Sequence, residues 1–414
     1  MSTDSLPAPL PNPLPSPLPA QLPASLPAAA RMIIAALGSL KFGALRLKTP
    51  DCTSLLYGDG SAPVTLDLRN WQLCSAVLRS GDIGFAETYI AGDWKTDNLP
   101  GLITLMLRNR AQFESLIYGN WWGSLLYRIK HLLNRNSRAG SKKNIHAHYD
   151  IGNAFYALWL DPGMTYSSAL FSEGATLEQA QQEKYRRIAG QLQLPPGATV
   201  LEIGCGWGGF AETAIREHGA HVTGLTLSTE QLAHARQRLQ DAGLDRQADL
   251  QLRDYRDSHG QYDAIASIEM FEAVGQRYWP GYFECLARNL KPGGRACIQT
   301  IVIADELFER YSKSTDFIQQ YIFPGGMLPS PAAFRQGAEQ AGLRVIDAFA
   351  FGLDYAHTLR LWRVRFLAQR AALEKQGFDG RFLLTWEFYL AYCEAAFLAH
   401  NTDVLQFTLV KESP

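Results

Sequence analysis

The sequence predicts an α/β protein whose larger part is a doubly wound, mostly parallel sheet, preceded by a smaller α/β unit. From about residue 150, apolar strand-like segments alternate with amphipathic helical segments through short connections, which is typical of a parallel sheet covered by helices on both faces. The first of these strands runs into a glycine-rich turn, GCGWGG at 204–209, which opens a helix. The length of 414 residues allows about two or three domains.

The composition excludes several classes of protein. Lys plus Arg total 39 against 40 Asp plus Glu, and the net charge of −1 argues against a generally basic nucleic-acid-binding protein. The 6 cysteines are scattered without a CxxC pair, which argues against a disulfide framework or a Cys-based zinc site. We therefore expect no metal site, no nucleic-acid partner and a reducing, cytoplasmic location.

The chain is expected to begin with an extended, disordered arm over residues 1–30. Nine of its 21 prolines lie between Pro7 and Pro27, and proline fixes φ and removes a hydrogen-bond donor. The arm lacks the basic and apolar regions of a secretory signal peptide. No window of about 18 apolar residues follows it, so we expect no membrane-spanning helix.

The first unit is expected to be a compact α/β domain over residues 31–115. Residues 64–68 (VTLDL) alternate like a strand, and residues 70–81 are typical of a helix that ends at its final glycine. Residues 82–94 carry apolar and aromatic side chains at helical spacing, and residues 99–110 predict another helix.

Residues 116–147 predict a basic amphipathic linker. No acidic residue occurs between positions 115 and 149, whereas basic residues are frequent there. These basic residues are Arg128, Lys130, Arg135, Arg138, Lys142 and Lys143. In NWWGSLLYRIKHLLNR, apolar and aromatic side chains recur at helical spacing between the charges, which suits an anionic lipid surface. The alternative is a linker helix whose apolar side packs on the protein.

Residues 148–414 carry the alternating elements. The predicted strands are 199–204, 221–228, 248–255, 262–268 and 294–303, and the predicted helices between them begin with 208–219 and 229–243. The glycine turn alone is weak as a signal, because dinucleotide-binding enzymes share it. A nicotinamide enzyme would place an acid after the second strand for the ribose hydroxyls, whereas Thr226-Leu227-Ser228 stand there. The sequence thus disfavours nicotinamide, and a purely structural turn is the alternative.

Several motifs together resemble one family. LEIGCGWGG, GLTLSTEQ, RDYRD and SIEMFEAVG are similar to segments of the S-adenosylmethionine-dependent cyclopropane fatty-acyl-phospholipid synthases and mycolic acid methyltransferases. The resemblance continues in HYDIGNAFYALWLDPGMTYSSALF, YIFPGGMLPS, DYAHTLRLW and FYLAYCEAAF. It implies a class I methyltransferase fold over 148–414, a lipid-binding-type domain before it, and a homodimer at the inner membrane surface.

The resemblance also implies which residues hold S-adenosylmethionine. The expected set is Tyr166, Ser167, Gly204, Gly206, Thr226, Leu227, Gln231, Asp254, Tyr255, Arg256 and Ile268. The glycines would face the amino-acid end, Thr226 the ribose and Tyr255 the adenine. An aromatic, mostly neutral pocket tolerates a sulfonium through cation–π attraction.

In this family a bicarbonate ion is held by a Cys, a Glu, a His, a Tyr and an Ile carbonyl. The resemblance places the Glu at Glu272, the Tyr at Tyr355 and the Ile at Ile301, whereas Ser168 stands at the Cys position and Gln299 at the His position. Both replacements are neutral donors, unlike an imidazolium, and this leaves the bicarbonate and a cyclopropane product open.

The implied reaction methylates the double bond of unsaturated acyl chains in membrane phospholipids. Methyl transfer leaves a carbocation, from which a weak base removes one proton in the absence of water. Loss from the new methyl group closes a cyclopropane, and loss from a chain carbon gives a methyl-branched or methylene chain or a furan precursor. Tyr149, just before the catalytic segments, is a further candidate. The alternative functions are an amine N-methyltransferase and a non-catalytic lipid-binding relative. The alternative roles for Glu272 and Tyr355 are structural, as a helix cap and a half-buried ring.

Overall fold

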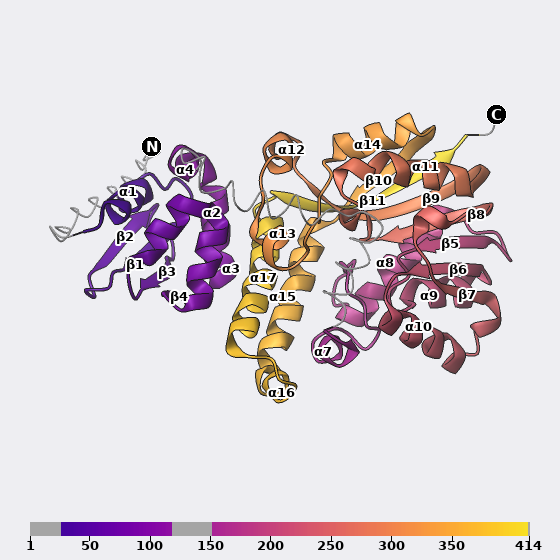
Figure 1. The fold of residues 1–414 in the computed structure, drawn as a ribbon, viewed down its shortest axis with the longest axis horizontal. Helices are drawn as coiled ribbons and strands as arrows, with labels where there is room; N and C mark the ends of the chain where they lie inside the picture. Colours follow the sequence, from indigo (N-terminus) through magenta and orange to yellow (C-terminus); the bar gives the residue numbers. More distant parts are fainter. Residues whose placement is uncertain (1–25, 118–150, 413–414) are drawn as a thin grey trace, which may run out of the picture.

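The computed structural model describes residues 26–117 and 151–412, and Figure 1 shows them as a smaller unit at the left and a larger one at the right. The predictions for residues 1–25, for the linker between 118 and 150 and for Tyr149 lie outside the described residues. Helix α1 (Ala28–Leu37) starts inside the range predicted for the arm, because Leu26 and Ala30 are buried in the hydrophobic core.

The N-terminal unit packs helices against one face of a four-stranded sheet of order β2-β1-β3-β4. Its elements after α1 are β1 (Ala44–Lys48), β2 (Ser54–Gly58), β3 (Val64–Leu68), α2 (Gln72–Ala91), β4 (Trp94–Thr96), α3 (Leu99–Arg108) and α4 (Arg110–Ile117). The predicted strand 64–68 is β3, parallel to β1. Ser80 and Gly81 have non-helical backbone, with φ of +58° at Gly81, so the first helical stretch ends there as predicted, and the second, also predicted, completes α2 up to Ala91.

The larger unit is built on a seven-stranded sheet of order β10-β11-β9-β8-β5-β6-β7. Its strands are β5 (Thr199–Ile203), β6 (His221–Thr226), β7 (Ala248–Leu252), β8 (Tyr262–Ile268), β9 (Leu290–Ile303), β10 (Leu343–Ala350) and β11 (Thr402–Lys411). Strands β5 to β9 pair in parallel, whereas β11 runs antiparallel to both β9 and β10. The predicted doubly wound, mostly parallel sheet is therefore confirmed.

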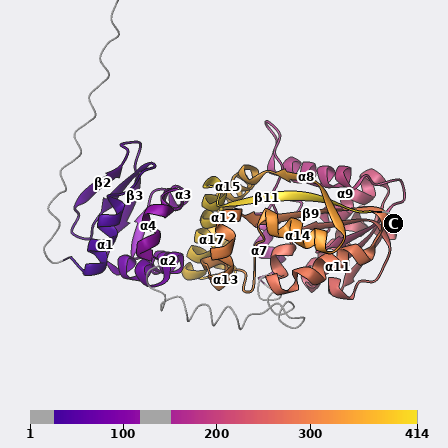
Figure 2. The same ribbon diagram turned by 90° about the horizontal axis from the view of Figure 1, so that it is seen from above.

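Helices cover both faces of this sheet. The helices of the larger unit are α7 (Asn153–Ala157), α8 (Leu177–Leu192), α9 (Gly209–His218), α10 (Thr229–Asp241), α11 (Trp279–Asn289), α12 (Asp305–Ser312), α13 (Phe317–Tyr321), α14 (Pro331–Gln340), α15 (Gly352–Ala368), α16 (Arg370–Lys375) and α17 (Gly380–Leu398). Figure 2 shows α8 and α9 on one side of β9 and β11, with α11 and α14 on the other. Two separate hydrophobic clusters fill these two interfaces, one around Phe210 and one around Phe283 and Phe334.

The long helices α15 and α17 lie between the two units (Figures 1 and 2). One continuous core joins Trp94 and Leu102 of the N-terminal unit to Trp362 and Phe388 of these helices. A polar contact also joins the two units, where the Tyr392 hydroxyl donates to Asp82 at 2.8 Å. In residues 26–117 and 151–412, every helix is too short or too polar to cross a bilayer.

Candidate active site

The glycine-rich turn after β5 forms one wall of a pocket at the carboxyl ends of the parallel strands, where ligands bind in open α/β sheets. Gly204, Gly206 and Gly208 adopt left-handed backbone with φ of +86°, +51° and +86°, a conformation that favours glycine. The Gly204 N–H donates to the Leu225 carbonyl at 2.9 Å, which fixes the turn against β6. A Cβ atom on Gly204 would lie 3.0 Å from the Met270 side chain, so the turn also requires a small residue there.

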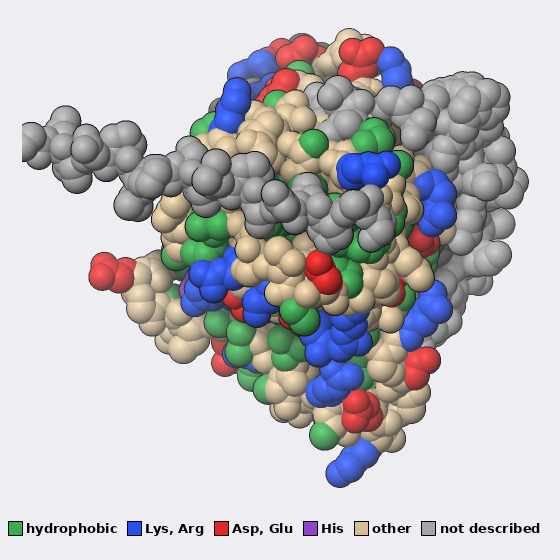
Figure 3. Space-filling view, turned by 90° about the vertical axis from the view of Figure 1, so that its left-hand side faces the viewer, with side chains coloured by type: hydrophobic (Ala, Val, Ile, Leu, Met, Phe, Trp, Pro, Cys, Tyr) green, Lys and Arg blue, Asp and Glu red, His purple; other side chains and the backbone are tan. Residues whose placement is uncertain are grey.

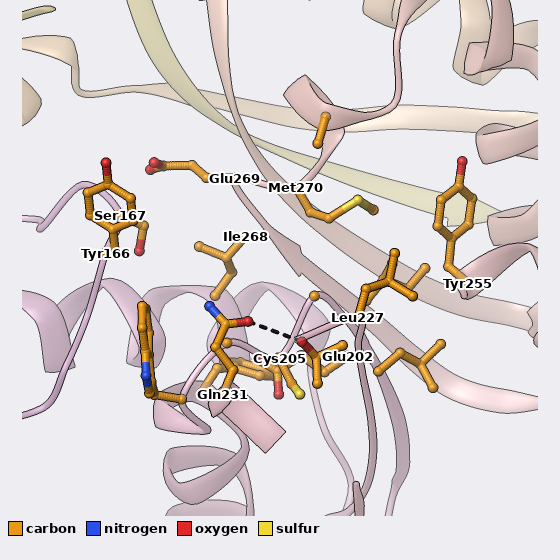
Figure 4. A pocket seen from close by; sticks show the side chains of 18 of the residues that line it. Tyr166, Ser167, Glu202, Cys205, Leu227, Gln231, Tyr255, Ile268, Glu269 and Met270 are labelled. Atoms are coloured by element: carbon orange, nitrogen blue, oxygen red, sulfur yellow. Dashed lines mark hydrogen bonds between the residues drawn. The ribbon is translucent and has the colours of Figure 1, made fainter. Parts of the chain in front are cut away.

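The structure brings together all the residues expected to hold S-adenosylmethionine. The pocket lining includes Tyr166, Ser167, Gly204, Gly206, Thr226, Leu227, Gln231, Asp254, Tyr255, Arg256 and Ile268. Figure 4 places Tyr255 at one end of this pocket and Tyr166 and Ser167 at the other, where Glu269 points toward them. The pocket therefore has one end, at Tyr255, that suits the adenine ring of the cofactor. Its opposite end, at Tyr166 and Ser167, is where the cofactor can present its methyl group.

Polar groups in this pocket fit the parts of S-adenosylmethionine. Asp254 accepts hydrogen bonds from Arg256 Nε at 2.8 Å and Nη2 at 2.5 Å, so the two charges balance. Glu202, which the sequence analysis did not single out, is only 2% exposed, and burial raises the pKa of its carboxyl well above the usual range. Its Oε2 has no hydrogen-bond partner among the described residues. A buried carboxyl without a partner suits the ammonium group of the methionine part.

A second residue that sequence reasoning missed, Glu269, lies at the centre of the expected catalytic group. Its Oε1 accepts from the Ser168 backbone N–H at 2.8 Å and from Gln299 Nε2 at 2.7 Å, and its Oε2 accepts from the Tyr355 hydroxyl at 2.5 Å. Burial raises the pKa of Glu269, and the charge of Lys184 and these three hydrogen bonds oppose that rise. One sequence signal pointed to it: Glu269 directly follows β8, at the end of the sheet where ligands bind.

The backbone of Glu269 is unusual for a residue with a side chain. Its φ is +50°, in the left-handed region that residues other than glycine rarely adopt. Such a conformation costs of order 1–3 kcal/mol and persists where the surrounding structure determines it, often at functional sites. Contacts from three distant segments of the chain hold this carboxylate in place.

Three expected catalytic residues make contacts other than those the sequence predicted. The Ser168 hydroxyl donates to the Ala169 carbonyl at 3.1 Å, so its backbone N–H rather than its hydroxyl reaches the cluster. Ile301 offers its N–H rather than its carbonyl, donating to Glu272 Oε1 at 2.5 Å. Burial, and then the nearby Glu269 carboxylate, raise the pKa of Glu272 to about 8. Glu272 is not among the pocket-lining residues.

This arrangement does not fit a bicarbonate ion. The side-chain donors of Gln299 and Tyr355 that were expected to hold it donate to Glu269 instead, and the Ser168 hydroxyl donates to the Ala169 carbonyl. A further anion at this point would lie beside Glu269 and the buried Glu272, with its charge unbalanced by these neutral donors. The carboxylate of Glu269 is thus the negative group that this cluster is built to hold.

A buried lysine supports the segment that carries Ser167. Lys184 is 0% exposed, and its Nζ donates to Ser167 Oγ at 2.5 Å and to Gln181 Oε1 at 2.6 Å. Burial lowers the pKa of Lys184 to about 7, although Glu269 and Asp161 act in the opposite direction. Lys184 therefore links the cofactor wall at Ser167 electrostatically to the Glu269 carboxylate.

Aromatic side chains pack behind Tyr166, which lines the same pocket as Glu269. The hydroxyls of Tyr166 and Tyr389 are hydrogen-bonded at 2.7 Å. The Trp362 ring lies 5.4 Å from that of Tyr166 and 6.2 Å from that of Tyr355, measured between centroids. Ring faces of this kind stabilise a positive charge without providing a nucleophile that would react with it.

Comparisons with known proteins all lead to one family. A family model described as mycolic acid cyclopropane synthetase matches residues 136–407. The chain is 39% identical over 383 residues to tuberculostearic acid methyltransferase UfaA1 of Mycobacterium tuberculosis, covering 89% of this chain and 88% of that protein. It is 36% identical over 353 residues to cyclopropane-fatty-acyl-phospholipid synthase of Escherichia coli, covering 84% of this chain and 88% of that protein.

The fold leads to the same family. The solved structure of mycolic acid cyclopropane synthase CmaA1 complexed with SAH and CTAB is similar at a TM-score of 0.62 and 32% identity, over 65% of this chain and 98% of that one. In this chain a glycine turn, a buried acid and the residues expected to hold S-adenosylmethionine line one pocket. The chain therefore belongs to the mycolic acid cyclopropane synthetase family and is an S-adenosylmethionine-dependent methyltransferase.

Proposed function

We propose that the protein methylates the carbon–carbon double bond of unsaturated fatty acyl chains in membrane phospholipids. The observation that carries this proposal is the junction of two environments at one end of the pocket, where Tyr166 and Ser167 of the cofactor wall lie beside Glu269 and a cluster of aromatic rings. An amine substrate would need neither a buried base for carbon-bound hydrogen nor ring faces for a carbocation. The names of the relatives, which refer to fatty-acyl and mycolic acid chains, support the same substrate class.

Different residues of the chain then have different roles in this reaction. S-adenosylmethionine supplies an activated methyl group, whose transfer to the alkene leaves a positive charge on the acyl chain. Tyr166 lines the pocket and offers its ring to that charge, with Trp362 packed against it, and the buried surroundings exclude water that would convert the cation into an alcohol. A base then removes one proton, and its position relative to the chain decides between a cyclopropane and a methyl-branched or methylene product.

We further propose that the N-terminal unit docks on an anionic bilayer. Figure 3 shows Lys and Arg side chains spread among hydrophobic ones over this end of the molecule. On the open face of its sheet, Arg46 and Lys48 of β1 are exposed beside Leu56 of β2, which pairs with Arg46. Phe42 is 51% exposed on the same unit. Basic and apolar groups together suit anionic headgroups and the interface beneath them.

The first experiment incubates the protein with methyl-labelled S-adenosylmethionine and vesicles of cis-monounsaturated phospholipid, followed by mass spectrometry of the released fatty acids. Label in a cyclopropane, methylene or methyl-branched acid supports the function and identifies the product. Label in added small amines but not in lipid would refute it. Saturated phospholipid is the matched control, because it offers the same surface without a double bond.

Vesicle flotation tests the docking surface separately. The double variant Arg46→Glu with Lys48→Glu should lose binding to anionic vesicles. The variant Arg246→Glu with Arg277→Glu makes the same charge change at exposed positions on the larger unit and should still bind. Equal loss in both would show that net charge, rather than this face, attracts the membrane. Light scattering on the free protein tests the homodimer expected from the family.

A further inference from the structure

We infer that Glu269 is the general base of the reaction and does the work of a bound anion, so that turnover needs no bicarbonate. This inference rests on the proposed function and names the residue that completes it. Glu269 lines the cofactor pocket and points toward the wall formed by Tyr166 and Ser167 (Figure 4). Its carboxylate therefore lies beside the place where the methylated chain must form.

A chain of buried hydrogen bonds fixes the direction in which Gln299 donates. The Arg187 guanidinium can only donate, and its Nη1 lies 2.6 Å from Gln406 Oε1. Gln406 must therefore turn its Nε2 to Gln299 Oε1 at 3.0 Å, and Gln299 must turn its own Nε2 to Glu269 at 2.7 Å. Gln299 and Gln406 face each other on β9 and β11, and both are 0% exposed. Glu269 must accept this bond, which favours its ionised form.

The second oxygen of Glu269 is the one placed to take a proton. Oε1 already accepts two hydrogen bonds, whereas Oε2 accepts from Tyr355 alone among the described residues. Burial and the adjacent Glu269 raise the pKa of Tyr355 well above its usual range, so the phenol stays protonated and donates. A carboxylate oxygen has two lone pairs, and one on Oε2 is left for the substrate.

The proton step balances within the site. Either a C–H bond of the new methyl group breaks and its electron pair forms the cyclopropane bond to the positive carbon, or a C–H bond on a chain carbon next to the positive carbon breaks and its electron pair forms a double bond. The proton passes to Glu269 Oε2, and it leaves to solvent when the product is released. Glu272 is a poorer candidate, because it does not line the pocket and its Oε1 is held by the Ile301 N–H.

Two substitutions of Glu269 test the inference. Glu269→Gln keeps the size of the side chain and should lower turnover by about a hundredfold or more, which is the usual contribution of a general base, while S-adenosylhomocysteine still binds. Glu269→Gly suits the left-handed backbone and leaves space for a small anion. Added formate or bicarbonate should then restore part of its activity in a saturable way. Glu284→Gln, on the exposed side of α11, is the matched control.

The wild-type protein provides the third readout, because its rate should not change when dissolved bicarbonate is removed and restored. Full activity of Glu269→Gln, a wild-type rate that rises with bicarbonate, or a Glu269→Gly variant that binds cofactor but ignores both anions would overturn the inference. If the wild-type protein binds S-adenosylhomocysteine but labels no acyl chain, the proposed function fails and this inference fails with it. The two failures are thus distinguishable.

Discussion

The hydrogen bond from Gln299 to Glu269 makes a quantitative prediction about pH dependence. Gln299→Met keeps an unbranched side chain of similar length in the core but removes the donor that lies 2.7 Å from Glu269 Oε1. A hydrogen bond to a charged group contributes about 1.5–3 kcal/mol. Because about 1.4 kcal/mol corresponds to one pKa unit, the pKa of Glu269 should rise by about 1–2 units in the variant.

The sign of the effect on activity follows from the role of a base. A higher pKa leaves less ionised Glu269 at a given pH, so the acid limb of the kcat profile should move to higher pH by about 1–2 units. Activity should be reduced most on the acid side and should recover on the alkaline side. The assay is label transfer to unsaturated phospholipid across the neutral range, with cofactor saturating.

Gln191→Met is the control, because it removes a half-buried amide whose Oε1 accepts from Thr408 at 3.1 Å, a contact outside the Glu269 cluster. It should leave the acid limb unchanged. If Gln299→Met lowers kcat equally at all pH values, or if both variants shift the profile alike, Gln299 only supports the local packing and the reasoning about Glu269 is wrong.

Two further predictions concern stability and the cofactor turn. Burial, and then the nearby Asp82, raise the pKa of Asp316 to about 7 from its usual 3.8, so its contribution to stability is fully present below about pH 4 and is lost as pH rises through 7. Asp316→Asn keeps an N-cap for α13 and should flatten that decline and raise the neutral Tm, as calorimetry at several pH values would show; an unchanged pH dependence would contradict it. Gly204→Ala should weaken S-adenosylhomocysteine binding and lower the free energy of unfolding by about 1 kcal/mol or more, because φ is +86° and the new Cβ would press on Met270. Calorimetric titration measures the affinity and thermal melting the stability, and wild-type values for both would contradict the prediction.

Much of the fold could be predicted from the sequence because the signals were local. Alternation of apolar strands and amphipathic helices predicts the parallel sheet, and the glycine turn predicts where the ligand binds. The junction between the units could not be found in this way, because it depends on α15 and α17, which pack side chains such as Phe388 against the distant Phe85 and Tyr89.

In the candidate site, too, local sequence signals could be predicted and contacts between distant residues could not. The cofactor wall could be identified because its residues lie in short motifs at successive strand ends. The catalytic centre could not, since Glu269 gains its environment from Ser168, Gln299 and Tyr355, which are far apart in the sequence. Without those contacts, an acid directly after a strand is indistinguishable from one that caps the following turn. From the sequence alone, Glu272 is therefore named as the catalytic acid and Glu269 is not considered.

Ser168 and Gln299 become understandable once Glu269 is considered with them. A positively charged imidazole at position 299 would pair with the carboxylate, stabilise its ionised form and make it a weaker base. A neutral amide orients the same carboxylate without that charge, and the backbone N–H of Ser168 needs no particular side chain. Burial then raises the pKa of Glu269 and so makes it a stronger base. The hydrogen-bond direction that Gln406 sets in Gln299 keeps Glu269 an acceptor. The two neutral residues and Glu269 thus form one consistent arrangement for removing a proton, rather than the remains of an anion site.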